Sequence, residues 1–357
     1  MTSFEQELES AWIAAIAPRE DNAPTVISTF AGMGGSSLGY KMAGFAVRLA
    51  VEWDADAVET YHINFPSTPI YHGDIAQLTV SEALKLANIE SGQLDVLDGS
   101  PPCQGFSIAG KRRIDDLRNR LFREYIRLLR GLRPRAFVME NVSGLIMGKM
   151  KHTFVEILRE LRACDYRVIV RLVDASYLGV PQKRRRLIFL GIRSDLHKIP
   201  VHPLPQTKAL SVYLALIGCK ENMAEREWLL AQGKKNVCGY RLWPFLKPGQ
   251  TGGTCNIDNG KAFSACRCNP NICAPTLVAK ASNIGLRDMM HWSECRRFTT
   301  SEYQRLFAIP DQYRWPDKDG NIGKRWSNAV ARMGNCVPPF LIRAVAIEIM
   351  KTLYQYR

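Results

Sequence analysis

The stretch "TVISTFAGMGGSSLGY" (residues 25–40) combines β-forming residues, a glycine-rich loop and the start of a helical pattern. Residues 25–32 predict a buried strand, because Val, Ile, Thr and Phe favour extended structure. Gly32, Gly34 and Gly35 let the following backbone turn tightly and approach a ligand closely. A strand that enters a helix through such a loop is typical of a nucleotide pocket, although turns and helix caps use the same residues.

The first half of the chain alternates apolar runs with helical patterns. Further strands are expected at residues 45–54, 94–100, 136–142 and 185–192, and helices at residues 55–65, 80–89, 119–132 and 152–164. This alternation predicts a parallel, doubly wound, Rossmann-like α/β sheet that is covered on both faces. In such a sheet, ligands bind at the carboxyl ends of the strands.

The composition changes near residue 194. Residues 194–295 are rich in Pro, Gly, Cys and Trp without sustained periodicity, which predicts a second, smaller and irregular domain. Residues 338–356 return to a helical pattern, which we expect to pack against the first domain. The predicted first domain therefore comprises residues 1–195 and 326–357, and the second domain with its hinge comprises residues 196–325.

The composition is that of a globular protein with a basic surface. The 357 residues include 48 Lys or Arg and 34 Asp or Glu, a formal net charge of +14. Residues 111–135 hold ten of the basic and three of the acidic residues, and residues 182–193 hold five more basic ones. Both runs lie beside the sharpest motifs, which favours contact with phosphate groups over a purely solvated surface.

No apolar run has transmembrane length, and the first residues are acidic. We therefore expect a cytoplasmic, nucleoid-associated protein without a signal peptide or membrane partner. Its ten cysteines are then expected to be reduced thiols.

Two acidic residues support an adenosine-binding pocket beside the glycine loop. Glu52 ends the second strand, where a carboxylate can accept both hydroxyl groups of a ribose, and Trp53 offers a face for adenine. Asp74 lies in the next loop, where it can accept a hydrogen bond from the adenine amino group. Helix capping by Asp74 and core packing of Trp53 are the alternatives. Because Ser37 replaces the third glycine of the GxGxxG pattern, S-adenosylmethionine is the preferred cofactor and NAD the alternative.

A cysteine follows the strand expected at residues 94–100. In "SPPCQG", Pro101 and Pro102 hold Cys103 at a fixed angle beyond the strand end, and Gly105 leaves the next loop free to move. A thiolate is a strong nucleophile, and nearby cations favour its formation. A buried structural cysteine is the more common case, but this Pro-Pro-Cys-Gln-Gly setting favours covalent catalysis.

Polar residues also accompany two later strands. Glu140 closes the apolar run "AFVM", which predicts a functional acid at the sheet edge, with a cap or a salt-bridge partner as the alternative. In "QKRRR" (residues 182–186), successive side chains of an extended segment point to opposite faces. One face is expected to serve the active site and the other a phosphate backbone. Gln182, Arg184 and Arg186 share one face, and Lys183 and Arg185 share the other.

Six motifs, in one order, resemble the DNA (cytosine-5)-methyltransferase family of bacterial and phage type. They are "FAGMGG" (30–35), "GSPPCQGFS" (99–107), "ENV" (140–142), "QKRRR" (182–186), "RRFTTSEYQRLFAIPDQY" (296–313) and "GNCVPP" (334–339). The resemblance spans residues 25–341 without the irregular middle. It departs from the family at Ser28 and Thr29, where many members have Asp-Leu, and at Cys336, where Ser is usual. Gly105 stands where the tRNA-methylating branch has proline, so it favours the DNA branch.

The resemblance implies a mechanism and a set of site residues. Cys103 would attack C6 of a flipped-out cytosine, Glu140 would contact N3, and Arg186, supported by Arg184, would hold O2. C5 would then take a methyl group from S-adenosylmethionine, which leaves S-adenosylhomocysteine as product. The implied cofactor-binding residues are Phe30, Gly32, Gly34, Gly35, Glu52, Trp53, Asp74, Ile75, Pro102, Leu121, Asn335 and Cys336. The implied DNA-binding residues are Gln104, Ser107, Lys111, Arg112, Arg113, Gln182, Lys183, Arg185 and Thr276.

The resemblance also places recognition of a target sequence in the middle domain, whose loops suit readout of the major groove. Cys255, Cys266, Cys268 and Cys273 raise the alternative of a structural zinc, but no CxxC pair is present, so we expect no metal. We expect a monomer that acts on duplex DNA, with a cognate restriction endonuclease as a further partner. The competing hypotheses are an RNA (tRNA) cytosine-5 methyltransferase, a non-catalytic DNA-binding relative and a nicotinamide-dependent dehydrogenase.

Overall fold

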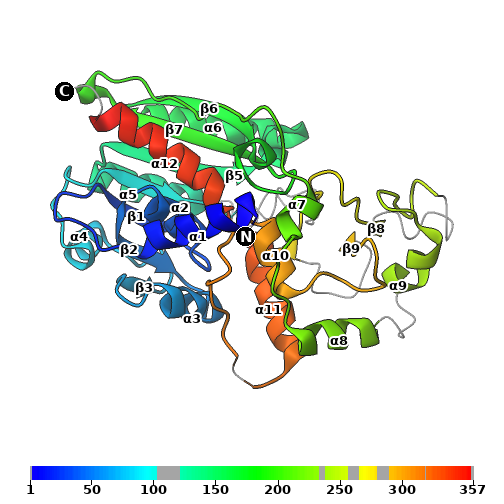
Figure 1. Cartoon of the computed structure of the whole chain (residues 1–357). Helices are drawn as coiled ribbons and strands as arrows, with labels where there is room; N and C mark the ends of the chain where they lie inside the picture. The colour runs from blue at the N-terminus through cyan, green and yellow to red at the C-terminus, as the bar shows by residue number, and fades with distance from the viewer. Residues whose placement is uncertain are drawn as a thin grey trace. The chain divides into compact units, whose positions relative to one another are not determined.

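The computed structural model describes residues 2–102, 121–232, 238–255, 265–279, 289–317 and 319–354. The chain folds into two compact units (Figure 1). The sheet unit comprises Ile13–Asp174, Arg185–Pro205 and Pro339–Arg357. The helical unit comprises Met1–Trp12, Ala175–Arg184 and Gln206–Pro338. Helix α1 (Ser3–Ile16) is divided between them, and none of the described helices is long and apolar enough to cross a membrane.

The sheet unit is built on one sheet with the strand order β3-β2-β1-β4-β5-β7-β6. Its strands are β1 (Thr25–Thr29), β2 (Ala46–Glu52), β3 (Ile70–His72), β4 (Val96–Gly99), β5 (Ala136–Val142), β6 (Tyr166–Asp174) and β7 (Arg185–Arg193). The strands from β3 to β5 are parallel, and β7 runs antiparallel to both of its neighbours. The predicted doubly wound α/β architecture is confirmed, with one reversed strand.

The reversal of β7 and the presence of β3 and β6 were not expected from the sequence. β3 has only three residues, and β6 carries exposed side chains such as Arg167 and Arg171 that break its apolar pattern. Residues 175–184 join β6 to β7, and this connection is shorter than the dozen or so residues that a parallel crossover needs. The two strands therefore pair antiparallel.

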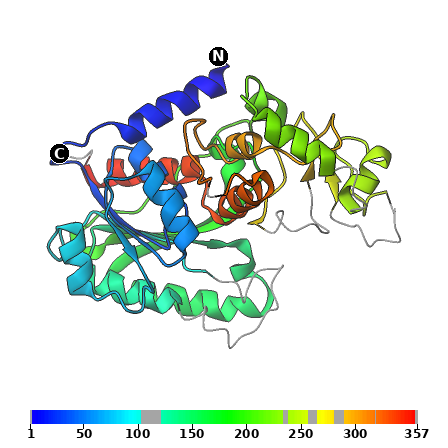
Figure 2. The same ribbon diagram turned by 90° about the horizontal axis from the view of Figure 1, so that it is seen from below.

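Helices cover both faces of the sheet. α4 (Val80–Ala87), α5 (Leu121–Leu132) and α6 (Lys151–Arg162) pack on one face, where their apolar side chains join those of the strands in the main core. α2 (Gly35–Met42) and α12 (Pro339–Tyr354) pack together on the other face, as Figure 2 shows for the red helix α12. α3 (Ala55–Asn64) lies beside β2 and β3. The expected positions of α3 to α6 are confirmed.

A close approach ties α12 to α2. A Cβ atom on Gly39 would lie 2.5 Å from the carbonyl oxygen of Pro339, so only glycine permits this packing. Near the other end of α12, the hydroxyl group of Tyr354 donates to Asp95, which also forms an ion pair of 2.9 Å with Arg135. The C-terminal helix therefore packs against the first domain, as the sequence predicts.

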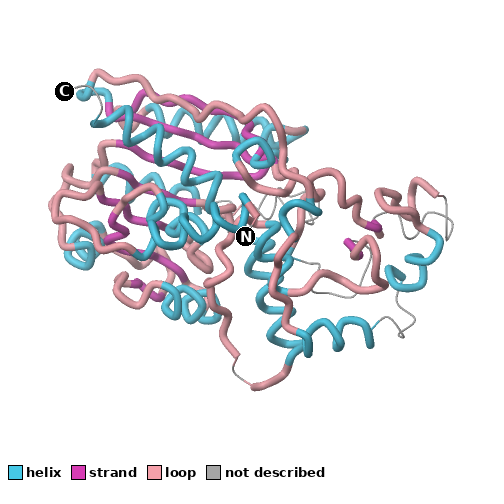
Figure 3. The backbone as a smooth tube through the Cα atoms, in the orientation of Figure 1, coloured by secondary structure: helices cyan, strands magenta, loops and turns pink. Residues whose placement is uncertain are grey.

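The helical unit consists mainly of short helices and loops (Figure 3). Its described elements are α7 (Val212–Leu216), α8 (Met223–Gln232), α9 (Cys238–Leu242), α10 (Thr300–Leu306), α11 (Ile322–Asn335), β8 (Cys266–Arg267) and β9 (Met289–Met290). α10 packs against α7 and α11, and α11 packs against α8. Trp326 on α11 is buried and donates its indole N–H to the carbonyl oxygen of Phe298.

Buried ion pairs organise the start of α10. Arg296 is 1% exposed, and its guanidinium lies 2.6 Å from the carboxylate of Glu302. Glu302 also accepts the backbone N–H of Thr299 in a capping box at the start of α10. Arg305 is likewise buried and pairs with Asp311 at 2.6 Å. Removing one partner of such a pair would leave an uncompensated buried charge, so these residues fix the local fold.

A buried histidine of the sheet unit predicts a pH-dependent stability. Among the described residues, neither ring nitrogen of His202 has a hydrogen-bond partner, and burial, followed by the charge of Arg171, lowers the pKa of His202 to about 4. The unfolded chain binds this proton near pH 6.5, so stability is lost as the pH falls from about 6.5 towards 4. We expect the unfolding free energy of the wild type, measured with urea, to fall by about 1–2 kcal/mol more between pH 7 and pH 5 than that of His202→Leu. Equal losses would contradict this prediction.

Candidate active site at the carboxyl edge of the sheet

The parallel register brings candidate residues to one edge of the sheet. Thr29 of β1 pairs with Gly99 of β4, and Gly99 pairs with Met139 of β5, so the carboxyl ends of these strands are level. The glycine loop follows β1 and the two prolines at 101–102 follow β4. Glu140 lies directly after Met139 in β5. Three chemically distinct segments therefore meet at the same edge.

The carboxylate of Glu52 holds the glycine loop against the end of β2. Its Oε2 accepts the backbone N–H of Gly32 at 2.7 Å, and its Oε1 accepts the N–H groups of Trp53 and Asp54 at 2.9 Å each. The side chain is 8% exposed. A carboxylate has about four acceptor positions, so Glu52 retains capacity for a ligand hydroxyl group.

Two glycines of the loop differ in what surrounds them. Gly34 has a φ of +96°, and a Cβ atom there would lie 2.8 Å from the ring of Phe65. Gly32 has a φ of +56°, but nothing lies within 4 Å of the position of its Cβ atom. Gly34 is therefore required by packing as well as by backbone conformation, whereas Gly32 borders open space that a ligand can fill.

The other implied cofactor residues of the sheet unit differ in exposure. Trp53 is 76% exposed, which leaves its indole face available to a ligand. Asp74 is exposed and accepts the backbone N–H of Ala76 at 3.0 Å, so it forms a local turn. The side chain of Ile75 is buried in the main core. Phe30, Pro102 and Leu121 are half-buried, and Gly35 begins α2.

Glu140 and Arg186 form an ion pair at this edge. The Nε atom of Arg186 lies 2.7 Å from Oε1 of Glu140, across the antiparallel pairing of β5 with β7. Their side chains are 13% and 9% exposed, so both groups are held in place with little contact with water. A planar guanidinium beside a carboxylate can bind neighbouring donor and acceptor atoms of a planar ring.

Asn141 connects this pair to the segment that leads to Cys103. Its Nδ2 donates to the carbonyl oxygen of Pro101 at 3.3 Å, and its Oδ1 accepts the backbone N–H of Val142 at 2.9 Å. The sequence interpretation did not single out Asn141. Its polarity between Glu140 and Val142, at the end of an apolar run, was the only signal.

The alternation predicted for residues 182–186 is confirmed by burial. Gln182 is fully buried, whereas Lys183 is exposed. The amide of Gln182 donates to the carbonyl oxygen of Leu306 and accepts the N–H of Leu277, and the hydroxyl of Thr276 donates to the carbonyl oxygen of Lys183. Both polar ends of Gln182 thus have partners inside the helical unit.

Arg184 is also buried in the helical unit. Its guanidinium donates to the carbonyl oxygens of Leu277 (2.9 Å), Gly334 (2.8 Å) and Cys336 (3.0 Å), and it lies over the ring of Phe307. The side chain is 1% exposed. Arg184 therefore joins three backbone positions of the helical unit, and its support of catalysis stays a prediction.

The remaining site residues predicted from the sequence lie elsewhere in the chain or outside the described residues. Cys103, Gln104, Ser107, Lys111, Arg112 and Arg113 lie outside the described residues. Asn335 and Cys336 lie at the end of α11 in the helical unit, and Arg185 is exposed in the sheet unit. Among the described residues, no group of three or more His, Cys, Asp or Glu side chains could hold a metal ion.

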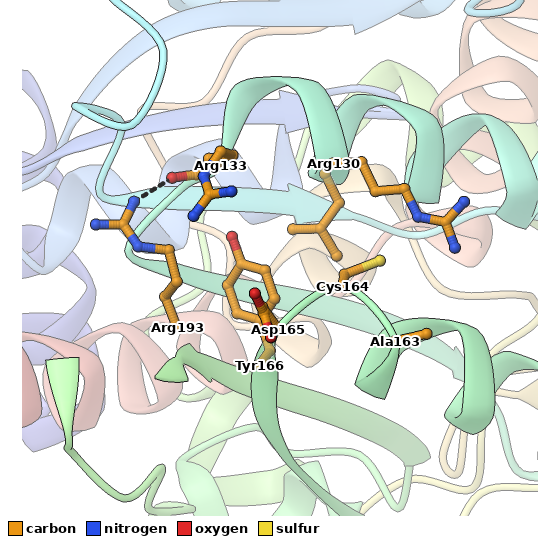
Figure 4. Close-up of a pocket in the computed structure, with 8 residues that line it drawn as sticks. Arg130, Arg133, Ala163, Cys164, Asp165, Tyr166 and Arg193 are labelled. Carbon is orange, nitrogen blue, oxygen red and sulfur yellow. Dashed lines mark hydrogen bonds between the residues drawn. The ribbon is translucent and has the colours of Figure 1, made fainter. Parts of the chain in front are cut away.

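A cavity of about 220 Å³ lies at the opposite edge of the sheet, where β6 begins and β7 ends (Figure 4). Arg130, Arg133 and Arg193 line it together with Cys164. Arg193 donates to the carbonyl oxygen of Arg133, and Arg130 pairs with Glu160 at 2.8 Å. Its position at the amino ends of the parallel strands leaves the carboxyl edge as the candidate active site.

The sequence profile of the C-5 cytosine-specific DNA methylases matches residues 24–351. The chain belongs to this family. It is therefore a DNA cytosine-5 methyltransferase, and the resemblance stated from its motifs is confirmed.

Individual relatives match over nearly the whole chain. The type II methyltransferase M.NgoPII of Neisseria gonorrhoeae is 35% identical, over 94% of this chain and 98% of that protein. M.XorII of Xanthomonas oryzae pv. oryzae is 32% identical, over 92% and 85%. Among solved structures, a putative DNA modification methyltransferase encoded within a prophage (E. coli) is 26% identical, with a TM-score of 0.72 over 93% of this chain and 99% of that one. A DNMT2 variant of Spodoptera frugiperda, 20% identical with a TM-score of 0.65 over 92% and 100%, shares the fold.

The two glycines offer a matched test of the methyltransferase's glycine loop. We expect Gly34→Ala to lower the unfolding free energy by about 2–4 kcal/mol, because the new methyl group meets Phe65 in a left-handed backbone. Gly32→Ala is expected to lower the unfolding free energy by only about 1 kcal/mol. It should nevertheless lower the rate of methyl transfer when the methyl donor is below its saturating concentration. Urea unfolding and methylation assays check this. Equal destabilisation by both variants would contradict it.

Proposed function

We propose that this methyltransferase uses S-adenosylmethionine to methylate C5 of a cytosine flipped out of a specific duplex DNA sequence. The reaction passes through a covalent bond between Sγ of Cys103 and C6 of the base. The observation that carries this proposal is the Glu140–Arg186 pair at 2.7 Å. Glu140 lies on β5, next to β4, and β4 leads to Cys103. Asn141, which binds the carbonyl oxygen of Pro101, supports the same arrangement.

The residues around the glycine loop fit S-adenosylmethionine. Gly32 borders open space, Glu52 retains acceptor capacity for the ribose, and Trp53 exposes an indole face for adenine. Asp74 is exposed one strand further along the same edge. When bound, this cofactor supplies a methyl group on a positively charged sulfur, which is an electrophile for a carbon nucleophile.

The chain's own residues then perform the remaining chemistry. The Cys103 thiolate adds to C6, which breaks the aromaticity of the ring and makes C5 nucleophilic. Glu140, in its acid form, donates its proton to N3 and Arg186 donates to O2, so that the electron density gained by the ring is stabilised, and the N3 proton returns to Glu140 when Cys103 leaves. After C5 has taken the methyl group, a base removes the C5 proton and the electron pair expels Cys103. The products are 5-methylcytosine in DNA and S-adenosylhomocysteine.

The base must leave the duplex, because C6 cannot be reached inside a stacked helix. We propose that Gln104, Ser107 and the basic residues 111–113 contact the DNA around the flipped base, together with exposed Lys183 and Arg185. The helical unit, with Thr276, is proposed to read the target sequence. The type II names of the relatives favour a role beside a restriction endonuclease.

Labelled S-adenosylmethionine and mixed genomic DNA test this function. The wild type is expected to produce 5-methylcytosine, and Cys103→Ser is expected to lower the rate by a factor on the order of 10³ or more, because a hydroxyl group is a far weaker nucleophile. Cys164→Ser is the matched control, since Cys164 lies at the opposite edge of the sheet. We expect its rate to equal that of the wild type.

Three outcomes would contradict parts of the proposal. Label at adenine N6 or cytosine N4 would exclude the covalent mechanism. Label in tRNA but not in duplex DNA would favour the RNA alternative. A wild-type rate for Cys103→Ser would remove Cys103 from the mechanism.

A further inference from the structure

A buried acid on β4 has no place in the mechanism above. Asp98 is 1% exposed and lies five residues before Cys103. The strand register places it directly opposite Ser28 of β1, the strand that enters the glycine loop.

Hydroxyl groups from two other elements converge on Asp98. Ser28 of β1 donates to Oδ2 at 3.2 Å, and Tyr40 of α2 donates to Oδ1 at 3.4 Å. Ser36, in the first turn of α2, also hydrogen-bonds to the carboxyl group. The hydroxyl of Thr29 donates to the backbone carbonyl of Asp98 at 2.9 Å. β1 enters the glycine loop and α2 leaves it, so Asp98 is bonded to both ends of that loop.

The protonation state of Asp98 changes within the physiological range. Burial raises the pKa of this carboxyl group to about 7, although the hydrogen bonds from Ser28, Ser36 and Tyr40 oppose the rise and the charge of Glu140 adds to it. An ionised carboxylate can accept all three hydroxyl groups, whereas the protonated acid must use one oxygen as a donor. The ionised form therefore holds the loop more firmly.

The groups that face Asp98 do not titrate in its place. Burial raises the pKa of Tyr40 and Tyr125 well above 10, and it also raises the pKa of Tyr61. These phenols stay neutral near pH 7. Glu140, on β5, is the other carboxyl group whose charge acts on Asp98.

We propose that Asp98 is a positioning residue that couples the cofactor loop to β4, the strand that leads to Cys103, by holding both ends of the glycine loop against β4. The inference rests on the proposed function, which assigns the cofactor to that loop. In its ionised form Asp98 fixes the loop in the shape that binds the donor. Affinity for the donor therefore rises as the pH rises through 7.

This role can be separated from a structural one because the two predict opposite changes in stability. A buried acid with a raised pKa lowers the folding stability as the pH rises from about 4 to 7, since the unfolded chain releases the proton first. Replacing Asp98 by the neutral and nearly isosteric Asn removes this penalty. Asp98→Asn should therefore be at least as stable as the wild type at pH 8, yet bind the donor less tightly.

The experiment measures binding of S-adenosylhomocysteine by calorimetry at pH 6, 7 and 8, together with the thermal midpoint. We expect the wild type to bind several-fold more tightly at pH 8 than at pH 6. Asp98→Asn should bind about tenfold more weakly at pH 8, with no pH dependence and an unchanged or higher midpoint. In methylation assays its KM for the donor should rise while kcat changes by less than about threefold.

Two further variants sharpen the result. Asp95→Asn is the matched control, since Asp95 is a buried acid next to β4 at the other edge of the sheet, where it pairs with Arg135. It should lower the thermal midpoint and leave donor affinity unchanged. The double variant Ser28→Asp with Asp98→Ser moves the carboxyl group across the register pair and should restore most of the affinity.

The proposal is overturned if Asp98→Asn binds S-adenosylhomocysteine with wild-type affinity and pH dependence, or if Asp95→Asn loses affinity equally. If Asp98→Asn does not fold, the pH dependence of the wild type tests the proposal alone. A wild-type affinity for S-adenosylhomocysteine that does not change between pH 6 and pH 8 overturns it. A wild type that binds no S-adenosylhomocysteine at any pH contradicts the proposed cofactor instead.

Discussion

The site depends on the parallel hydrogen-bonded register of β2, β1, β4 and β5. Backbone hydrogen bonds set the ends of these strands level. Residues just beyond neighbouring strands are therefore brought close together by the backbone, without contacts between their own side chains. Glu52 then uses three backbone N–H groups to hold the glycine loop in place. Since these bonds are made before any ligand binds, little ordering remains to oppose binding.

Several of the arginines that make the chain basic are unavailable to DNA. Arg184, Arg296 and Arg305 are at most 1% exposed, and each donates to carboxylates or carbonyl oxygens within the helical unit. A guanidinium is suited to such sites because it stays charged and presents several fixed donors. The basic run at residues 182–193 is therefore partly structural.

The sequence predicts what depends on local pattern. Apolar runs and helical periodicity located β1, β2, β4, β5 and α3 to α6, and the motif order led to the family. The sequence did not predict β6, because Arg167 and Arg171 are exposed on this edge strand and interrupt its apolar pattern. Gln182 and Arg184 look like surface or active-site residues in the sequence. Their partners lie about 90 to 150 residues away in the chain and become evident only in the fold.

The packing of α12 on α2 has a consequence for how the chain is made. Gly39 and Pro339 are in contact but are separated by about 300 residues of sequence, including nearly all of the helical unit. During synthesis, the surface of α2 that α12 covers therefore stays without its partner until the helical segments have been made. Contacts of such sequence separation form slowly, and this surface is exposed to other chains in the meantime. The packing of α2, which begins at the glycine loop, is therefore completed only after the helical unit has been synthesised.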